Sequence, residues 1–347
     1  MPRAREIGNT LWVGGSSSLA RTYVNEFGVD DLLLVGAEAS APSWVLRLGA
    51  RYRSLDLTAL DDVTAARFIK ESGPISTIVV GVRPLLFAAT TKTMIPQQMI
   101  RGIRILLENA FETNDVRFVL HISSVAAVDH LRSQSFINED SPIPPSASLR
   151  APYDLFKRGC ETSISGVCED AGVSFSHLRL SAIFSDDRKC IQCSALELQS
   201  RIGAYIPVAI DCNSSVNVAY AIDSLIREHK RISQPVYYYT RPRSLKRPVP
   251  YGYYLMMFRK AYEIEKTSIW IPAWVVDCCV ALVHWIAGYN NYLRLPYLDS
   301  VDYLLQVSSR EHSFDCRRFQ KDFPNLKEES ILECFLRRKL CLEQPVY

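Results

Sequence analysis

The sequence of 347 residues predicts an α/β protein built on a doubly wound parallel β-sheet, with a smaller, mainly helical C-terminal lobe. Three observations support this prediction. Short apolar runs alternate with longer amphipathic stretches from Thr10 to about Leu180, as in successive βαβ units. Most of these runs are continuous, which indicates strands covered by helices on both faces of the sheet. The first run ends in VGGSSSLAR, a turn of small residues that is typical of a Rossmann-type nucleotide-binding fold.

Six strands and three of the helices between them can be placed in this N-terminal part, because turn residues bound each apolar run. The predicted strands are 10–15, 31–36, 52–55, 76–82, 117–122 and 173–180, and the predicted helices are 65–71, 95–113 and 152–171. After Ser181 the alternation becomes irregular, and the connection at 241–250 is rich in proline and basic residues. We therefore expect a Rossmann domain over 1–180, completed by parts of 211–240, and a substrate-binding lobe over 181–347.

The overall composition excludes several classes of function. With 40 basic and 37 acidic residues the formal net charge is only +3, so no global charge attracts the chain to nucleic acid. The N-terminal residues are polar and lack the apolar stretch of a secretory signal, which favours synthesis in the cytosol. The ten cysteines are scattered, as expected of reduced thiols. Cys190 and Cys193 have the spacing of half a zinc site, but no second pair accompanies them, so we predict no metal.

The turn after the first strand is the first candidate for cofactor binding. Compared with the glycine pattern G-x-x-G-x-x-G, Gly14 matches, whereas Ser17 and Ala20 stand at the other two glycine positions. Both replacements are small, so we expect the close approach of a pyrophosphate to be strained but still allowed. An ordinary strand-to-helix turn is the alternative. The residues predicted to contact the dinucleotide here are Gly14, Gly15, Ser17, Ser18 and Leu19.

The second and third strands supply the candidates for the adenosine half of a dinucleotide. Gly36 stands where an acidic residue normally accepts the ribose hydroxyls, and Glu38 follows two residues later. Asp56 and Leu57 come after the third strand, where an Asp-Leu pair would contact adenine, although Asp56 could equally be a solvated loop residue. No Lys or Arg lies between Gly36 and Leu46 to bind a 2′-phosphate, although Arg21 is a candidate for it. We therefore expect NAD or NADP, with NAD slightly favoured.

The strongest cluster of chemistry-bearing residues is Ser124 together with Tyr153 and Lys157. Ser124 ends the fifth strand, and Tyr153 begins a helix after a gap of 28 residues. Tyr153 and Lys157 are spaced i, i+4, so they project from one face of that helix. A nearby ammonium stabilises a phenolate, which lets the tyrosine exchange a proton with a substrate oxygen held by Ser124. This arrangement predicts the active site of a hydride-transfer enzyme.

With these motifs in place, the sequence resembles the 3β-hydroxysteroid dehydrogenase/isomerase family of extended short-chain dehydrogenases/reductases, which includes sterol-4α-carboxylate 3-dehydrogenases. The resemblance covers most of the chain, and the segments that carry it are VGGSSSLA, SLDLT, IRGIRILLENAFETNDVRFVLHISSVAAV, INEDSPIPP, YDLFK, LRLSAIF and NVAYAI. It implies NAD(P)-dependent oxidation of a steroid or sterol 3β-hydroxyl, followed by decarboxylation at C4 in the carboxysterol branch. It also implies that Tyr153 is the general base, that Lys157 assists it and binds the ribose, and that Ser124 polarises the substrate with Ser123 as its substitute.

Departures from the family pattern keep two alternatives open. Leu180 and Ser185 replace a usual proline and glycine, and VVGVRP replaces a small-residue stretch after the fourth strand. A non-catalytic nucleotide-binding regulator or scaffold of the same fold is therefore one alternative. A nucleotide-sugar epimerase or another reductase of the extended family is the second.

The apolar segment 269–289 predicts contact with a membrane. Tryptophans lie near its ends, as interfacial anchors do. A helix from Ala273 to Ala287 would rise only about 22 Å, less than the roughly 30 Å of a hydrocarbon core. We therefore expect a peripheral association with the cytosolic face of a membrane, the endoplasmic reticulum by family resemblance, or else a buried core helix in a cytoplasmic protein. We also leave open a homodimer.

Overall fold

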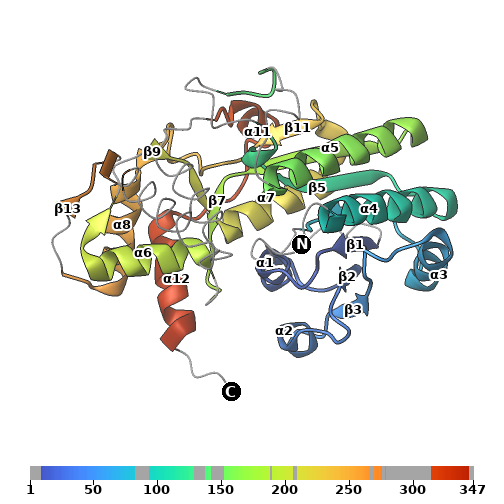
Figure 1. Cartoon of the computed structure of the whole chain (residues 1–347), viewed down its shortest axis with the longest axis horizontal. Coiled ribbons are helices and arrows are strands. Elements are labelled where there is room, and N and C mark those ends of the chain that lie inside the picture. The colour runs from blue at the N-terminus through green and yellow to red at the C-terminus, as the bar shows by residue number, and fades with distance from the viewer. Residues whose placement is uncertain are drawn as a thin grey trace, which may run out of the picture.

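The computed structural model describes a Rossmann-like α/β fold centred on a seven-stranded parallel sheet (Figure 1). The described residues are 9–82, 94–128, 137–141, 152–187, 190–205, 209–265, 269–272, 274–275, 278 and 314–343. The strand order is β11-β6-β5-β4-β1-β2-β3, so the chain reverses its direction of winding between β1 and β4. The strands are β1 Thr10–Val13, β2 Leu32–Gly36, β3 Arg51–Ser54, β4 Thr77–Val80, β5 Phe118–Ser124, β6 Ser174–Leu180 and β11 Val236–Tyr238.

Helices cover both faces of this sheet, as its continuous apolar strands predict. One face packs against α3 (Asp62–Ser72), α4 (Met94–Thr113) and α5 (Pro152–Ala171), and the other against α1 (Ser18–Phe27) and α7 (Ser215–Arg227). Figure 1 shows α4 and α5 lying side by side along the sheet. The six predicted strands are present with their ends shifted by at most two residues. The predictions missed α1, α7 and the short α2 (Ser43–Arg47).

The sheet is completed by residues from beyond position 180. After the lobe begins, the chain returns to the domain through α7, whose apolar side chains join the core on the α1 face. It then adds β11, which pairs in parallel with β6 from Val236 opposite His177 to Tyr238 opposite Arg179. Both elements lie within the predicted contribution of 211–240.

Within the described residues, the lobe contains three main helices and short two-stranded ribbons, which Figure 1 shows beside the sheet. Its apolar core is formed by α6 (Ile191–Ile202), α8 (Tyr251–Tyr262) and α12 (Ile331–Glu343). The ribbons pair β7 (Ala182–Phe184) with β10 (Cys212–Ser214), β8 (Ala204–Tyr205) with β13 (Ile269–Trp270), and β9 (Ala209–Ile210) with β12 (Val249–Pro250).

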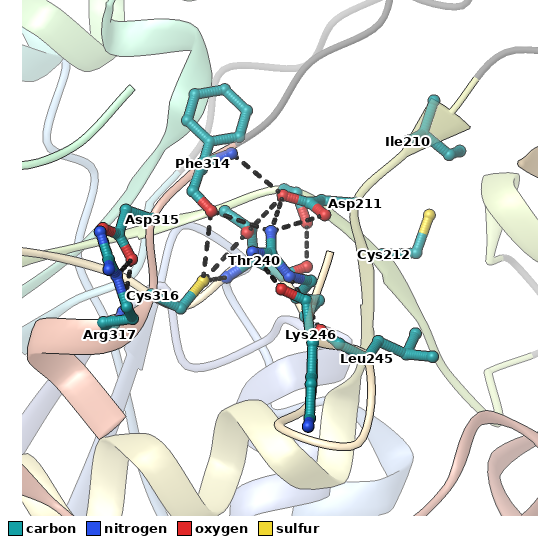
Figure 2. A network of polar contacts seen from close by, with 12 residues as sticks. Ile210, Asp211, Cys212, Thr240, Leu245, Lys246, Phe314, Asp315, Cys316 and Arg317 are labelled. Atoms are coloured by element: carbon teal, nitrogen blue, oxygen red, sulfur yellow. Dashed lines mark hydrogen bonds and ion pairs between the residues drawn. The ribbon is translucent and has the colours of Figure 1, made fainter. Parts of the chain in front are cut away.

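A buried ion pair joins the lobe to the C-terminal segment that precedes α11 (Arg317–Asp322), as Figure 2 shows. Both oxygens of Asp211 accept from Nη1 of Arg241, at 2.9 and 2.7 Å, and Oδ2 also accepts from the Thr240 hydroxyl at 2.8 Å. The same Nη1 donates to the carbonyl of Phe314. The guanidinium of Arg241, in the basic connection 241–250, is therefore buried against Asp211 instead of facing solvent.

Only part of the apolar segment 269–289 lies within the described residues. Ile269 and Trp270 form strand β13, before the start of the predicted helix 273–287, and the side chains of Ile269 and Trp274 are 74% and 66% exposed. Asp277 and His284 lie outside the described residues. Among the helices described, none is long and apolar enough to cross a membrane.

Candidate nucleotide-binding and catalytic site

The candidate site lies at the carboxyl ends of the neighbouring strands β1 and β4, where the strand order reverses, which is where ligands bind in open parallel sheets. Two glycines bring the turns after these strands together. A Cβ on Gly14 would lie 2.6 Å from the carbonyl oxygen of Gly81, and Gly14 has φ of +88°. A Cβ on Gly15 would lie 2.7 Å from the Cβ of Leu34. No larger residue fits at either position, so the backbone of this turn is held close to β2 and β4.

The serine at the second glycine position is accommodated as a helix cap. Ser17 has φ of −70° and ψ of 155°, and its Oγ accepts a hydrogen bond from the backbone N–H of Ala20 at 3.2 Å. Ala20 is fully buried in the core beside β1. The strain expected at these two positions is therefore absent from the turn itself. The amides of Ser18 and Leu19, in the first turn of α1, have no acceptor within the helix and suit an anion.

Glu38 is held by a residue that the sequence analysis missed. The hydroxyl of Tyr52 on β3 donates to Oε2 and to the carbonyl of Glu38, each at 3.1 Å. Burial and the charge of Glu38 raise the pKa of Tyr52 to about 12, so the phenol remains a donor. A Cβ on Gly36 would lie 2.6 Å from this hydroxyl, so Gly36 leaves the room that Tyr52 occupies. Glu38 and Tyr52 together therefore form a polar site just beyond the carboxyl end of β2, where a ribose would lie.

The two other candidates for the adenosine half have different surroundings. Asp56 is exposed, and its Oδ1 accepts from the amide and hydroxyl of Thr58, at 2.9 and 2.7 Å. Leu57 is buried, and its carbonyl packs against α4 so closely that a Cβ on Gly102 would lie 2.0 Å from the oxygen. Both residues follow β3 at the carboxyl edge of the sheet, next to Glu38 and Tyr52. Arg21, considered for a 2′-phosphate, instead pairs with Asp186 at 3.2 Å.

Lys157 is only 4% exposed and connects the carboxyl ends of two strands. Its Nζ donates to the carbonyl of Val82, just after β4, at 3.0 Å, and to that of Ile122 in β5 at 2.8 Å. These bonds place a buried ammonium at the sheet edge next to the glycine turn. Tyr153 is half-buried one helical turn earlier on the same face of α5.

Ser124 lies on the segment that contacts this part of α5. It ends β5 and caps the short helix η1 (Val125–Ala127), with its Oγ accepting from the amide of Ala126 at 3.2 Å. Helix α5 packs against η1, and Nε of Arg158 donates to the carbonyl of Ala127 at 2.6 Å. The fold therefore brings Ser124 to the same region as the first turns of α5.

Ser123 is not a substitute for Ser124, because its hydroxyl is used elsewhere. It is buried and donates to Oε1 of Glu161 at 2.6 Å. Both oxygens of Glu161 also accept from Arg179 on β6, at 2.9 and 2.7 Å, and Arg179 donates to the hydroxyl of Tyr238 at 2.7 Å. Burial alone would raise the pKa of Glu161, but the hydrogen bonds and charge of Arg179 hold it below its usual value.

A pair of buried histidines lies next to the polar cluster formed by Ser123, Glu161 and Arg179. The Nδ1 atoms of His121 and His177 are 3.2 Å apart, and Nε2 of His177 is 2.9 Å from the hydroxyl of Ser165. Burial lowers the pKa of both imidazoles, to about 4 for His177 and well below its usual value for His121, which is also near Lys157. Tyr153, Lys157, Glu161 and Ser165 recur every four residues along α5. Their spacing is the signal in the sequence that could have extended the predicted site beyond its first two members.

In the described part of the chain, no group of three or more His, Cys, Asp or Glu side chains is arranged to hold a metal ion. No protein-family model matches the sequence, and a comparison with curated proteins gives no match.

Solved structures do resemble this chain, and the likeness spans nearly the whole length of each. L-threonine dehydrogenase from Phytophthora infestans has a TM-score of 0.69 at 18% identity and covers 97% of this chain and 100% of its own. The Bordetella bronchiseptica enzyme WbmH, solved with NAD⁺, has a TM-score of 0.69 at 11% identity, with coverage of 98% and 99%. UDP-glucose 4-epimerase from Thermotoga maritima, solved with UDP-glucose, has 0.67 at 12%, with coverage of 96% and 98%. At these identities the likeness shows the fold, a Rossmann-like α/β architecture with a C-terminal lobe.

Proposed function

We propose that the protein is an NAD(P)-dependent oxidoreductase of the extended short-chain dehydrogenase/reductase superfamily. The observation that carries this proposal is the position of Lys157, a buried ammonium at the carboxyl ends of β4 and β5, one helical turn from Tyr153. The similar fold of enzymes such as WbmH, which was solved with NAD⁺, supports it further.

The residues at this edge of the sheet fit a dinucleotide. Gly14 and Gly15 keep the turn free of side chains, and the amides of Ser18 and Leu19 suit the pyrophosphate. Glu38, positioned by Tyr52, would accept the ribose hydroxyls, which favours NAD because a 2′-phosphate would be repelled by the carboxylate. Asp56 and Leu57 would contact the adenine. The bound nicotinamide would supply the acceptor or donor of the hydride.

The chain's own residues would handle the proton and the substrate oxygen. The ammonium of Lys157 favours the ionised form of the nearby phenol, so Tyr153 would exchange a proton with a hydroxyl or carbonyl of the substrate. Ser124 would donate a hydrogen bond to the same oxygen. Lys157 would also bind the nicotinamide ribose, so it would serve both the cofactor and the reaction.

For the substrate, we propose the 3β-hydroxyl of a steroid or sterol, with loss of CO₂ if a C4 carboxylate is present. This part of the proposal rests on the resemblance of the sequence motifs to the 3β-hydroxysteroid dehydrogenase/isomerase family. A nucleotide sugar is the second candidate, because UDP-glucose 4-epimerase from Thermotoga maritima has a similar fold over both chains. Turnover assays with 3β-hydroxysterols and with UDP-sugars distinguish the two candidates.

Replacing Tyr153 with phenylalanine tests the assigned chemistry. The variant should lose turnover on a competent substrate by about two to four orders of magnitude, the usual contribution of a positioned acid or base, while dinucleotide affinity stays within about twofold. A Tyr153→Phe enzyme that retains most of its activity would show that another group transfers the proton. If wild type binds dinucleotide but turns over no substrate of either class, the non-catalytic alternative is favoured.

We also propose that 269–289 holds the protein at the cytosolic face of a membrane such as the endoplasmic reticulum. The exposed side chains of Ile269 and Trp274 support this proposal, because exposed apolar side chains can insert into a membrane at the headgroup level. Replacing both with serine should move the protein from the membrane fraction to the cytosol in fractionated cells. Wild-type protein recovered wholly in the cytosol would contradict membrane association.

A further inference from the structure

The pair Cys190 and Cys193 lies at the N-terminus of α6 in the lobe, apart from the candidate catalytic site. Cys190 is the N-cap residue of this 12-residue helix, and Cys193 lies in its first turn. Residues three apart in a helical turn have Cα atoms separated by about 5 Å, within the roughly 4.4–6.8 Å that a disulfide requires. Cys190 is 7% exposed and Cys193 is fully buried. The backbone thus allows a cross-link between a more accessible and a less accessible thiol.

These thiols help to hold the end of β7 and the loop after it. Three consecutive carbonyl oxygens lie within hydrogen-bond distance of three cysteine sulfurs: Ile183 of Cys190 at 3.6 Å, Phe184 of Cys334 at 3.7 Å, and Ser185 of Cys193 at 3.4 Å. Arg338 on α12 also donates to the carbonyls of Ser185 and Asp187. The sulfurs of Cys190 and Cys193 therefore contact the segment that their oxidation would change.

The same segment reaches the nucleotide-binding turn. Asp186 follows Ser185 and pairs with Arg21 in the first turns of α1, between Oδ1 and Nη2 at 3.2 Å. A displacement of 183–187 would be transmitted to the helix whose N-terminus faces the candidate pyrophosphate site.

The pKa of Cys190 is lower than that of Cys193. Thiol–disulfide exchange needs this order, because the more accessible thiol must be the attacking thiolate. Hydrogen bonds from Cys193 and from Ser185 outweigh burial and lower the pKa of Cys190 to about 6. The same interaction with Cys190, together with burial, raises the pKa of Cys193. Cys190 is thus the thiolate at neutral pH, as is common for a cysteine at a helix N-terminus in a C-x-x-C sequence.

We propose that Cys190 and Cys193 form a thiol–disulfide redox site that reacts with low-molecular-weight disulfides of the glutathione class. The Cys190 thiolate attacks one sulfur of the small disulfide, whose S–S bond breaks to release one thiol and leave a mixed disulfide on Cys190. Cys193 then loses its proton and attacks the Cys190 sulfur, which expels the second thiol. The two cysteines lose two electrons and the Cys193 proton, the small disulfide gains the two electrons, and the second released thiolate takes its proton from water. This proposal does not depend on the proposed dehydrogenase activity.

Oxidation removes the S–H donor of Cys193, so the carbonyl of Ser185 loses its thiol partner. We expect the loop 183–187 to become less protected from hydrogen exchange in the oxidised protein. The effect should extend to the first turns of α1 through Asp186 and Arg21.

Differential alkylation of the full chain, equilibrated in glutathione redox buffers and analysed by peptide mass spectrometry, tests the site. In wild type, oxidised glutathione should convert the peptide containing both residues to the internal disulfide, while Cys160 remains reduced, because burial raises the pKa of that thiol to about 12. Cys193→Ser should instead accumulate glutathione on Cys190. Cys190→Ser should leave Cys193 unmodified.

The proposal fails if Cys190 and Cys193 remain reduced in a buffer that glutathionylates the exposed Cys341, or if Cys193 is modified before Cys190. Hydrogen exchange measured on the same samples tests the link to the loop. Exchange at 183–187 should increase by at least about threefold in oxidised wild type, with Cys190→Ser as the control that should not respond. A complete cross-link with unchanged exchange would overturn that link.

Discussion

At the scale of single residues, Lys157 has a structural role as well as a proposed catalytic one. Its ammonium donates to the carbonyl of Val82, just after β4, and to that of Ile122, in the neighbouring strand β5. Buried acceptors that lose their donor keep their full desolvation cost. Lys157, which is proposed to favour the ionised form of Tyr153, therefore also stabilises the edge of the sheet on which the cofactor would lie.

Replacement of Lys157 with alanine should accordingly reduce stability, dinucleotide affinity and turnover together. The expected loss is about 1–3 kcal/mol in the free energy of unfolding, measured by urea denaturation. Affinity and turnover should both fall by at least about tenfold, measured where the variant remains folded. Lys70→Ala provides the control, because Lys70 is exposed on α3 and should change stability by less than about 0.5 kcal/mol. A variant with wild-type stability and affinity would contradict both assigned roles.

The buried histidines give the stability of the protein a defined dependence on pH. His177 has a pKa of about 4 in the folded state, and the pKa of His121 is also well below 6.5, whereas an unfolded chain protonates both near 6.5. Below that value the unfolded state binds more protons, so stability falls as pH decreases from about 6.5 towards 4. With both histidines contributing, the slope approaches about 2.7 kcal/mol per pH unit.

Denaturation at a series of pH values measures this slope. Its matched control is the double variant His121→Gln with His177→Gln, which should show a flatter dependence over the same range. Equal slopes for wild type and the double variant would mean that these imidazoles are not held neutral by the fold.

At the scale of elements, the number of free backbone amides in the first turn of α1 determines how tightly a phosphate would be bound. The hydroxyl of Ser17 already accepts from Ala20, so this cap occupies one of the amides that the helix would otherwise offer to an anion. We expect Ser17→Gly to release that amide and to tighten dinucleotide binding by about two- to fivefold, at a cost of only a few tenths of a kcal/mol in stability. Ser17→Thr retains the cap and should leave affinity unchanged. Unchanged or weaker binding by Ser17→Gly would show that the cap does not limit affinity.

The elements also show how far the sequence could predict the site. Tyr153 and Lys157 were found because their i, i+4 spacing is local, and the same helical period reaches Glu161. Arg179 and Tyr238 depend on the pairing of β11 with β6, which joins strands far apart in the chain, and no local pattern encodes it. Tyr52 lies on the polar edge strand β3, where only the register with β2 places it beside Glu38.

At the scale of the whole molecule, the ion pair between Asp211 and Arg241 binds the backbone of Phe314, in the segment before α11, and so ties the lobe to that segment. Both side chains are buried, and removing one charge would leave the other without compensation. Asp211→Asn should therefore lower the free energy of unfolding by about 3–5 kcal/mol, measured by denaturation.

The matched control is Asp115→Asn, because Asp115 pairs with Arg117 at the surface, where both side chains are exposed. This control should change stability by less than about 1 kcal/mol. A comparable effect of the two substitutions would show that the buried pair does not hold the lobe in place.

The central claim is that the carboxyl edge of the sheet at β1 and β4 binds a nicotinamide dinucleotide. Calorimetric titration of the purified full chain with NAD⁺ and with NADP⁺ tests it most directly, with Gly14→Ala as the variant whose Cβ would strike the Gly81 carbonyl at a positive φ. We predict saturable binding of one dinucleotide per chain, tighter for NAD⁺ than for NADP⁺, and at least about tenfold weaker in folded Gly14→Ala. The absence of saturable binding of either dinucleotide to the folded wild type would contradict the account.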